Sequence, residues 1–211
     1  MNPSRKRTGI LLFDEVEVLD FCGPFEVFSV TRLHPEKRRE EASPFEVFLV
    51  SERGGKITAT GGLKVESDHS FASCPPLDIL VVPGGWGTRA LALHEPLLQW
   101  IRSRAVAVET LASVCTGSLL LAAAGLLEGR RATTHWQSLD RMRDSFPNVR
   151  VSRGEQVVED GSILTSAGIS AGIDMALRLV TREFGEEVAR ATARYMEYPF
   201  PESNARRIRI D

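Results

Sequence analysis

Cys115 is the residue of this chain whose position most strongly indicates nucleophilic chemistry. It stands between an apolar run ending in L-A-S-V and a helical run beginning T-G-S-L-L-L. A side chain at such a strand-to-helix junction lies at the tip of a sharp turn, as in a nucleophile elbow. The unpaired N–H groups and the dipole of the following helix are expected to favour the thiolate and to lower the pKa of the thiol. The alternative is a buried structural cysteine, because free cysteine is among the most buried residue types.

Three glycines are expected to shape the backbone around the thiol of Cys115. Gly84 and Gly85 follow a predicted strand, and their N–H groups are expected to face the same cleft as an oxyanion hole. Gly117 removes a side chain where the backbone must approach closely. The alternative for the P-G-G run is a simple tight turn. Its spacing is not GxGxxG and no lysine follows, so neither a dinucleotide fingerprint nor a phosphate-binding P-loop is predicted.

Two polar side chains are candidates for proton transfer. Asp20, in V-L-D-F-C-G-P, is either the N-cap of the helix that follows it or a proton shuttle against Cys115. A carboxylic acid held near a thiolate has a raised pKa and can donate its proton. His135, in T-T-H-W, either orients the thiol and relays protons or is a structural histidine. No histidine and carboxylate cluster has the spacing of metal ligands, so the sequence predicts no metal site.

Short apolar runs alternate with amphipathic segments along the chain. This βαβ rhythm predicts an α/β fold with a mainly parallel sheet and helices on both faces. Paired glycines and alternating apolar positions predict a small β-hairpin excursion over 54–70. Functional groups gather beyond the carboxyl ends of strands in such sheets, which directs attention to 14–20, 83–86, 115–116 and 134–136. Strands are expected at 8–13, 45–51 and 77–82, within 105–114, and at 131–134, 149–151, 157–159 and 163–165, and helices at 20–30, 95–104, 116–124, 138–146, 171–182 and 186–197.

The composition excludes several classes of protein. The 211 residues are 43% hydrophobic and 26% charged, with a formal net charge of −2, as in an ordinary globular protein. The short basic runs at both ends are expected to be solvated, so no nucleic-acid partner is predicted, and no apolar run is long enough to predict a membrane span. Cys22, Cys74 and Cys115 are odd in number and contain no CxxC, which argues against disulfides. Without a recognisable signal peptide, a cytoplasmic location is expected.

Five motifs follow one another along the chain: L-L-F-D-E-V-E-V-L-D-F-C-G-P-F-E-V-F, D-I-L-V-V-P-G-G, S-V-C-T-G-S, A-T-T-H-W and T-S-A-G-I-S-A-G-I-D-M-A-L. Their order resembles the ThiJ/PfpI superfamily from about Thr8 to Tyr198. This implies a single domain over 1–211, with its core at about 8–198, and a flavodoxin-like three-layer αβα sandwich. Homodimers are common in the superfamily, so a homodimer is expected. Within the superfamily the likeness is greatest to the isocyanide hydratase branch.

The resemblance also implies roles for individual residues. Cys115 matches the nucleophile of the superfamily, and Asp20 matches the acidic residue that contacts it. Thr116 matches a threonine that positions substrate or water. Protease-like members carry a histidine directly after the cysteine, so Thr116 argues against proteolysis. Regulators in the superfamily carry an additional helix-turn-helix domain, which a chain ending at residue 211 is expected to lack.

Other matched positions surround the nucleophile. Gly84 and Gly85 correspond to a glycine pair beside it, and His135 corresponds to a histidine that several members carry near the cysteine. Trp86 and Ile169 are expected to form apolar walls of the substrate pocket.

The implied reaction is the hydration of a small-molecule isocyanide to an N-substituted formamide, with no cofactor. Cys115 would attack the terminal carbon, Asp20 would supply a proton, and water would release the product. One alternative is a glyoxalase that converts methylglyoxal to lactate, with His135 as general base. Another is a non-enzymatic redox-sensing or ligand-binding stress protein, because exposed thiolates oxidise readily. An amidase or peptidase of the same superfamily is a further alternative.

Overall fold

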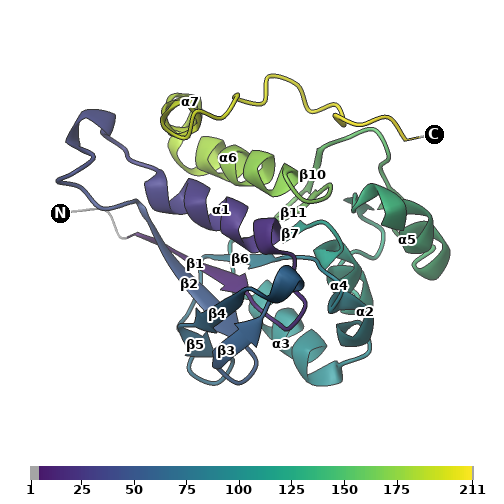
Figure 1. Cartoon of the computed structure of the whole chain (residues 1–211). Coiled ribbons are helices and arrows are strands. Elements are labelled where there is room, and N and C mark those ends of the chain that lie inside the picture. Colours follow the sequence, from purple (N-terminus) through teal and green to yellow (C-terminus); the bar gives the residue numbers. More distant parts are fainter. Residues whose placement is uncertain (1–4, 211) are drawn as a thin grey trace.

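A seven-stranded sheet forms the middle layer of the structure, a computed structural model that describes residues 5–210 (Figure 1). Neighbouring strands are parallel except for β10 and β11, which are antiparallel. The mainly parallel sheet expected from the sequence is therefore confirmed. Residues 1–4 and 211, the ends of the predicted domain 1–211, lie outside the described residues. In spatial order the strands are β10 (Val157–Asp160), β11 (Ile163–Ser166), β7 (Thr110–Val114), β6 (Ile79–Val82), β1 (Lys6–Leu11), β2 (Phe45–Ser51) and β5 (His69–Ser70).

Helices cover both faces of the sheet, which gives the predicted three-layer sandwich. Figure 1 shows one helical layer above the sheet and another below it. Because both faces are covered, every residue of the central strands β6 and β7 is buried, and the sequence of β6 reads as a continuous apolar run. The upper layer contains α1 (Val18–Val30), α6 (Ala171–Phe184) and α7 (Glu186–Tyr195), and the lower layer contains α2 (Thr88–Leu91), α3 (Glu95–Ala105) and α4 (Gly117–Ala123).

Two small sheets lie outside the central one. β3 (Gly55–Thr58) and β4 (Lys64–Ser67) pair antiparallel, so the hairpin predicted within 54–70 is confirmed. β8 (Arg131–Ala132) pairs with β9 (Arg150–Val151), and α5 (Leu139–Ser145) lies between them in the chain.

The strand expected within 105–114 is present as β7, and two other details of the predicted secondary structure are wrong. β7 begins at Thr110, because Ala105 ends α3 and a turn follows it. The apolar residues of that turn imitate a strand, yet Val106 is 87% exposed. The strand expected over 131–134 stops at Ala132, and the short helix α2 was not predicted.

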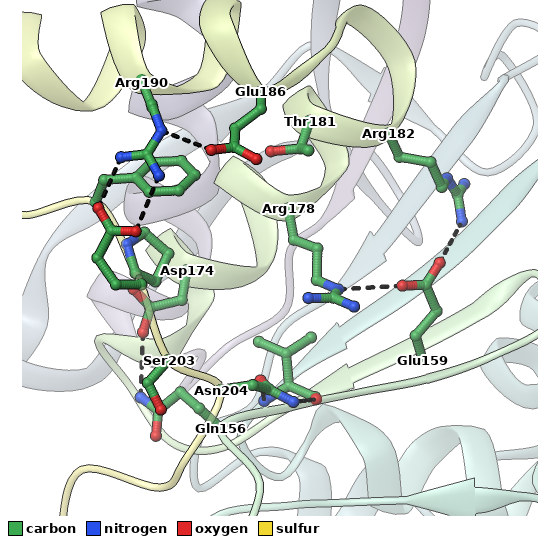
Figure 2. A pocket seen from close by; sticks show the side chains of 14 residues that line it. Gln156, Glu159, Asp174, Arg178, Thr181, Arg182, Glu186, Arg190, Ser203 and Asn204 are labelled. Atoms are coloured by element: carbon green, nitrogen blue, oxygen red, sulfur yellow. Dashed lines mark hydrogen bonds and ion pairs between the residues drawn. The ribbon is translucent and has the colours of Figure 1, made fainter.

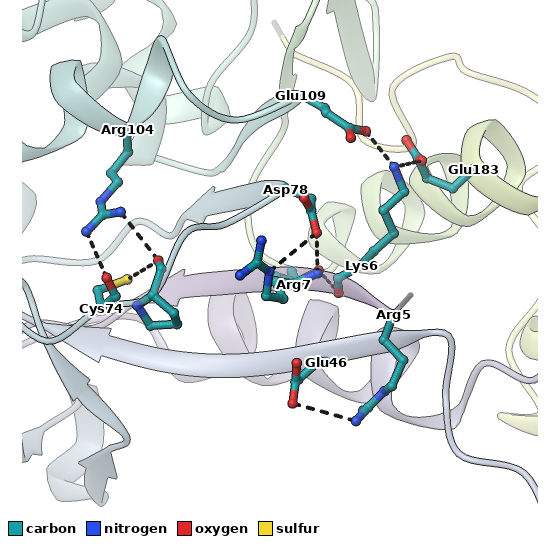
Figure 3. A network of polar contacts seen from close by, with 11 residues as sticks. Arg5, Lys6, Arg7, Glu46, Cys74, Asp78, Arg104, Glu109 and Glu183 are labelled. Carbon is teal, nitrogen blue, oxygen red and sulfur yellow. Dashed lines mark hydrogen bonds and ion pairs between the residues drawn. The ribbon is translucent and has the colours of Figure 1, made fainter. Parts of the chain in front are cut away.

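Charged residues pair at the amino-terminal ends of the central strands (Figure 3). Lys6, at the start of β1, pairs with Glu109, which precedes β7, and with Glu183 of α6. Beside it, the backbone N–H of Arg7 donates to Asp78 at 2.7 Å, just before β6. These contacts hold the beginnings of β1, β6 and β7 together. The carboxyl ends of the same strands lie at the opposite edge of the sheet.

No helix among residues 5–210 has the length and apolarity needed to cross a membrane.

Candidate active site

Cys115 forms a strained turn at the carboxyl end of β7. Its backbone has φ +58°, a left-handed conformation that is uncommon for residues other than glycine. Hydrogen bonds hold the turn: the carbonyl of Cys115 accepts from the hydroxyls of Thr134 at 2.9 Å and Ser118 at 3.0 Å. Helix α4 begins at Gly117, one residue later than predicted. The strand, turn and helix have the arrangement of a nucleophile elbow.

Gly117 allows this turn to pack against the end of β6. A Cβ atom at this position would lie 2.0 Å from the carbonyl oxygen of Val82. Any other residue would force the elbow away from its neighbouring strand. The close backbone approach expected from the sequence is present.

Asp20 is completely buried in the first turn of α1. Its Oδ2 accepts a hydrogen bond from the backbone N–H of Gly84 at 2.9 Å. The N-cap of α1 is Glu17, so the interpretation of Asp20 as a cap is wrong. Helix α1 begins earlier than predicted and places Asp20 within it, facing the end of β6.

The protonation of Asp20 is set mainly by its burial. Burial raises the pKa of its carboxyl to about 8, and the hydrogen bond from Gly84 opposes the rise. The side chain of Cys115 is close enough to affect the pKa of Asp20 as well. Oδ1 is buried and accepts no hydrogen bond from the described residues. Asp20 is therefore mostly a neutral acid at pH 7, with a proton available beside the thiol.

The expected low pKa of Cys115 is contradicted by the structure. Burial raises the pKa of the thiol well above its ordinary value, and the charge of an ionised Asp20 raises it further. The N–H and hydroxyl of Thr116 lower the pKa only in part. Cys115 is 6% exposed, and the helix after it has seven residues, so desolvation outweighs the helix dipole. Forming the thiolate requires a partner that accepts the proton.

The glycine pair positions other side chains instead of offering free donors. The N–H of Gly84 donates to Asp20, and the N–H of Gly85 donates to Thr116 Oγ1 at 3.0 Å. The oxyanion hole expected from these two N–H groups is therefore occupied by internal hydrogen bonds. A Cβ atom on Gly84 would lie 2.6 Å from both the backbone nitrogen and Oγ1 of Thr116, so only glycine lets the strands and elbow meet.

A cavity of about 220 Å³ opens in front of Cys115. It brings together Cys115 and Thr116 with four other residues predicted to lie at the site. Asp20, Gly84 and Gly117 are absent from the lining, and their contacts place them behind the nucleophile. The lining contains Gly85, Trp86, His135 and Ile169, and Glu17 from the segment 14–20. It also contains residues that the sequence did not indicate: Thr88, Arg89, Gln137, Ser138 and Arg141.

His135 forms part of the wall of this cavity. Its Nδ1 accepts a hydrogen bond from the N–H of Gln137 at 3.3 Å. Its ring lies against Gly168, where a Cβ atom would be 2.0 Å from Cδ2. Partial burial and the charge of Arg206 lower the pKa of His135, which favours the neutral imidazole.

The residues missed in the sequence come from different elements. Arg89 lies on α2 and Arg141 on α5, and each looks like an ordinary surface arginine in its own helix. What marks them as functional candidates is that both line the same cavity, and this cavity exists only in the folded chain.

A larger groove of about 520 Å³ lies between β10, α6, α7 and the C-terminal segment (Figure 2). Its charged groups are already paired: Arg178 with Glu159, and Arg190 with Glu186 and Glu202. The residues that line it include no cysteine. Figure 2 shows side chains that tie structural elements to one another, so the smaller cavity is the candidate active site. Among residues 5–210, no three His, Cys, Asp or Glu side chains cluster as metal ligands would.

Known proteins share this arrangement of fold and motifs. A model of the DJ-1/PfpI family matches residues 6–182. The isonitrile hydratase of Pseudomonas putida is 38% identical over 191 residues, which cover 90% of this chain and 77% of that protein. The HTH-type transcriptional regulator CdhR of Pseudomonas aeruginosa is 34% identical over 179 residues, covering 85% of this chain but 51% of the regulator, so the chain spans about half of its length. The crystal structure of a ThiJ/PfpI family protein from Pseudomonas syringae has a TM-score of 0.81 at 29% identity and covers 97% of this chain and 81% of that one. The chain therefore belongs to the DJ-1/PfpI family, as the order of its motifs predicts.

Proposed function

We propose that this protein hydrates a small isocyanide to an N-substituted formamide, with Cys115 as nucleophile and Asp20 as general acid and base. The observation that carries the proposal is the meeting of the elbow cysteine, the buried acid and Thr116 beside one small cavity. The similarity to an isonitrile hydratase over most of both chains supports the choice of substrate.

The buried pair provides a route for the proton. Ionised Asp20 accepts the thiol proton of Cys115 as the sulfur attacks the terminal carbon of R–NC. The same proton then passes from Asp20 to that carbon, which gives the thioimidate R–N=CH–S–Cys115. Water adds to the C=N bond, the C–S bond breaks, and R–NH–CHO leaves with the thiol restored. Each atom of water and isocyanide is accounted for in the formamide.

The surrounding residues have supporting roles in this proposal. Gly84 holds the carboxyl of Asp20, and Gly85 holds the hydroxyl of Thr116. Thr116 orients the sulfur or the water through that hydroxyl. Trp86 and Ile169 provide the apolar walls of the substrate pocket. None of these steps uses a cofactor.

The test is formamide production from an alkyl isocyanide by the wild type, Cys115→Ala and Asp20→Asn. We expect loss of turnover in Cys115→Ala and a decrease of about 10²–10⁴-fold in Asp20→Asn, the usual contribution of a general acid or base. Cys74→Ala removes a thiol remote from the cavity and serves as the matched control. Absence of formamide from the wild type contradicts the reaction, and activity that survives in Cys115→Ala contradicts the mechanism.

The pH profile tests the role of Asp20 independently. Asp20 must be ionised to accept the thiol proton, so kcat/KM is expected to rise with pH through about 8, where burial has moved its pKa. A kcat/KM that is constant from pH 6 to pH 9 would contradict a general-base role for this carboxyl.

A second candidate function is the glyoxalase reaction, which the position of His135 favours. The imidazole lines the same cavity as Cys115, and its lowered pKa keeps it available as a base. Lactate formation from methylglyoxal that disappears in His135→Ala, without turnover of isocyanides, would support this activity instead. Easy oxidation of Cys115 with no turnover of either substrate would support a sensing or ligand-binding role.

We further propose that the protein acts in the cytoplasm as a homodimer on its small-molecule substrate. Light scattering coupled to size-exclusion chromatography tests this assembly: a mass near that of one 23.3 kDa chain contradicts it.

A further inference from the structure

Two arginines line the cavity of Cys115 without a charged partner. Arg89 comes from α2 and Arg141 from α5, which Figure 1 shows on the same side of the molecule. Neither guanidinium forms an ion pair or a hydrogen bond with any side chain or backbone group of residues 5–210. By contrast, Arg143 on the same helix as Arg141 pairs with Asp140 and Asp144. The arginines at the cavity are therefore available to a ligand.

The position of Arg89 is partly set before a ligand binds. Its guanidinium carbon lies 4.1 Å from the centre of the ring of Trp86, a cation–π contact. Trp86 lines the same cavity and is 61% exposed. This contact holds the cation at the cavity mouth and leaves its N–H edge free for an acceptor.

The described residues that line the cavity carry more positive than negative charge. Glu17 is the one carboxylate among the described lining residues, against two guanidinium groups. Asp20, behind the nucleophile, is mostly neutral at pH 7 because its pKa is about 8. Arg206 adds a third cation behind His135, where it donates to Thr133 Oγ1 at 2.6 Å.

We propose that Arg89 and Arg141 bind a carboxylate of the substrate while its electrophilic carbon reacts with Cys115. A guanidinium presents paired N–H donors that match the two oxygens of a carboxylate. The cavity volume of about 220 Å³ lies below the ~300–1,000 Å³ of pockets for drug-sized ligands, so the substrate is small. The substrate is therefore a short isocyanide that carries a carboxylate. The isocyanide part of this choice rests on the proposed function.

Alkylation of Cys115 tests the arginines without any assumption about the reaction. Iodoacetate and iodoacetamide have nearly the same shape and react in the same way: sulfur forms a bond to carbon and iodide leaves. They differ in the charge that the arginines would bind. The measured quantity is the ratio of the two alkylation rates at Cys115, followed by peptide mapping and divided by the same ratio for free 2-mercaptoethanol.

We expect this normalised ratio to exceed one in the wild type and to fall in Arg89→Gln and in Arg141→Gln. The expected decrease is about two- to fivefold for each arginine, as for an exposed ion pair. Arg143→Gln, on the same helix but outside the cavity lining, is the control and keeps the wild-type ratio. A ratio that is the same in the wild type and both variants overturns the proposal.

A substrate comparison then separates this inference from the proposed function. An isocyanide with a carboxylate is compared with its methyl amide, and the ratio of their kcat/KM values is expected to fall in both arginine variants. Turnover of both compounds with equal kcat/KM in the wild type overturns carboxylate recognition but leaves hydration intact. If neither compound is turned over, the proposed function fails, and the alkylation ratio still decides whether the arginines bind an anion.

Discussion

Replacing Asp20 with asparagine should lower the activity by about 10²–10⁴-fold and, at alkaline pH, make the protein more stable. Asp20 is completely buried, and its pKa is about 8 in the folded protein against 3.8 for an ordinary aspartate. Between these values the folded protein keeps a proton that the unfolded chain has released. The free energy of unfolding therefore falls as the pH rises from about 4 to 8, and it is independent of this group above that range.

The pKa shift sets the size of the effect. Each pH unit in this range costs about 1.4 kcal/mol, so roughly 4 kcal/mol is lost between pH 5 and pH 8. Asparagine has the same shape, can accept the hydrogen bond from Gly84 and does not ionise. The stability of Asp20→Asn relative to the wild type should therefore increase by about that amount across the range.

Urea unfolding of both proteins at pH 5, 6, 7 and 8 measures this difference directly. Other titrating groups are shared by the two proteins, so their contributions cancel in the comparison. Parallel curves, with the same difference in unfolding free energy at every pH, would show that the Asp20 carboxyl is ionised throughout. That result would refute the assignment of the buried acid.

Three further substitutions test the geometry of the elbow and its support. Gly117→Ala should destabilise the protein by about 1–3 kcal/mol or more, because its Cβ would meet the carbonyl oxygen of Val82 at 2.0 Å; unchanged thermal unfolding would contradict this contact. Thr116→Val should reduce kcat and lower the free energy of unfolding by no more than about 1–3 kcal/mol, the cost of leaving the N–H of Gly85 without its acceptor. A kcat equal to that of the wild type would remove Thr116 from the mechanism. Asp174→Ala should cost about 3–5 kcal/mol, because this buried carboxylate binds an arginine and a tyrosine of the C-terminal segment; urea unfolding measures it, and a loss below about 1 kcal/mol would contradict an anchoring role.

The alternation of apolar and amphipathic segments was enough to predict the layers of the fold. Continuous apolar runs such as β6 become central strands because only burial on both faces accommodates them. The same criterion does not separate the turn at the start of 105–114 from the strand that follows it, because Val106 in the turn is apolar but exposed. The hydrophobic pattern shows only which side chains are apolar. A short apolar turn and a short buried strand therefore have the same pattern and cannot be told apart by it.

Local sequence also predicted the place of Cys115, since a strand, a turn and a helix are all defined by neighbouring residues. The ionisation of the thiol was decided by the tertiary structure. The helix dipole can be anticipated from sequence, but the desolvation of Cys115 and the approach of Asp20 depend on how distant segments pack. Burial has the larger effect on the pKa of the thiol because removing the thiolate charge from water costs more free energy than the dipole of one short helix supplies.

Sequence order alone determined which residues could react and at which edge of the sheet they would meet. Tertiary structure decided what each of them does: Gly84 and Gly85 hold Asp20 and Thr116, and Arg89 and Arg141 reach the same cavity from two separate helices. Hydrogen bonds and electrostatic potentials act over a few ångströms in space, whatever the separation of the residues along the chain. A pattern of neighbouring residues can therefore identify a nucleophile, but only the folded chain shows which groups control its proton and its substrate.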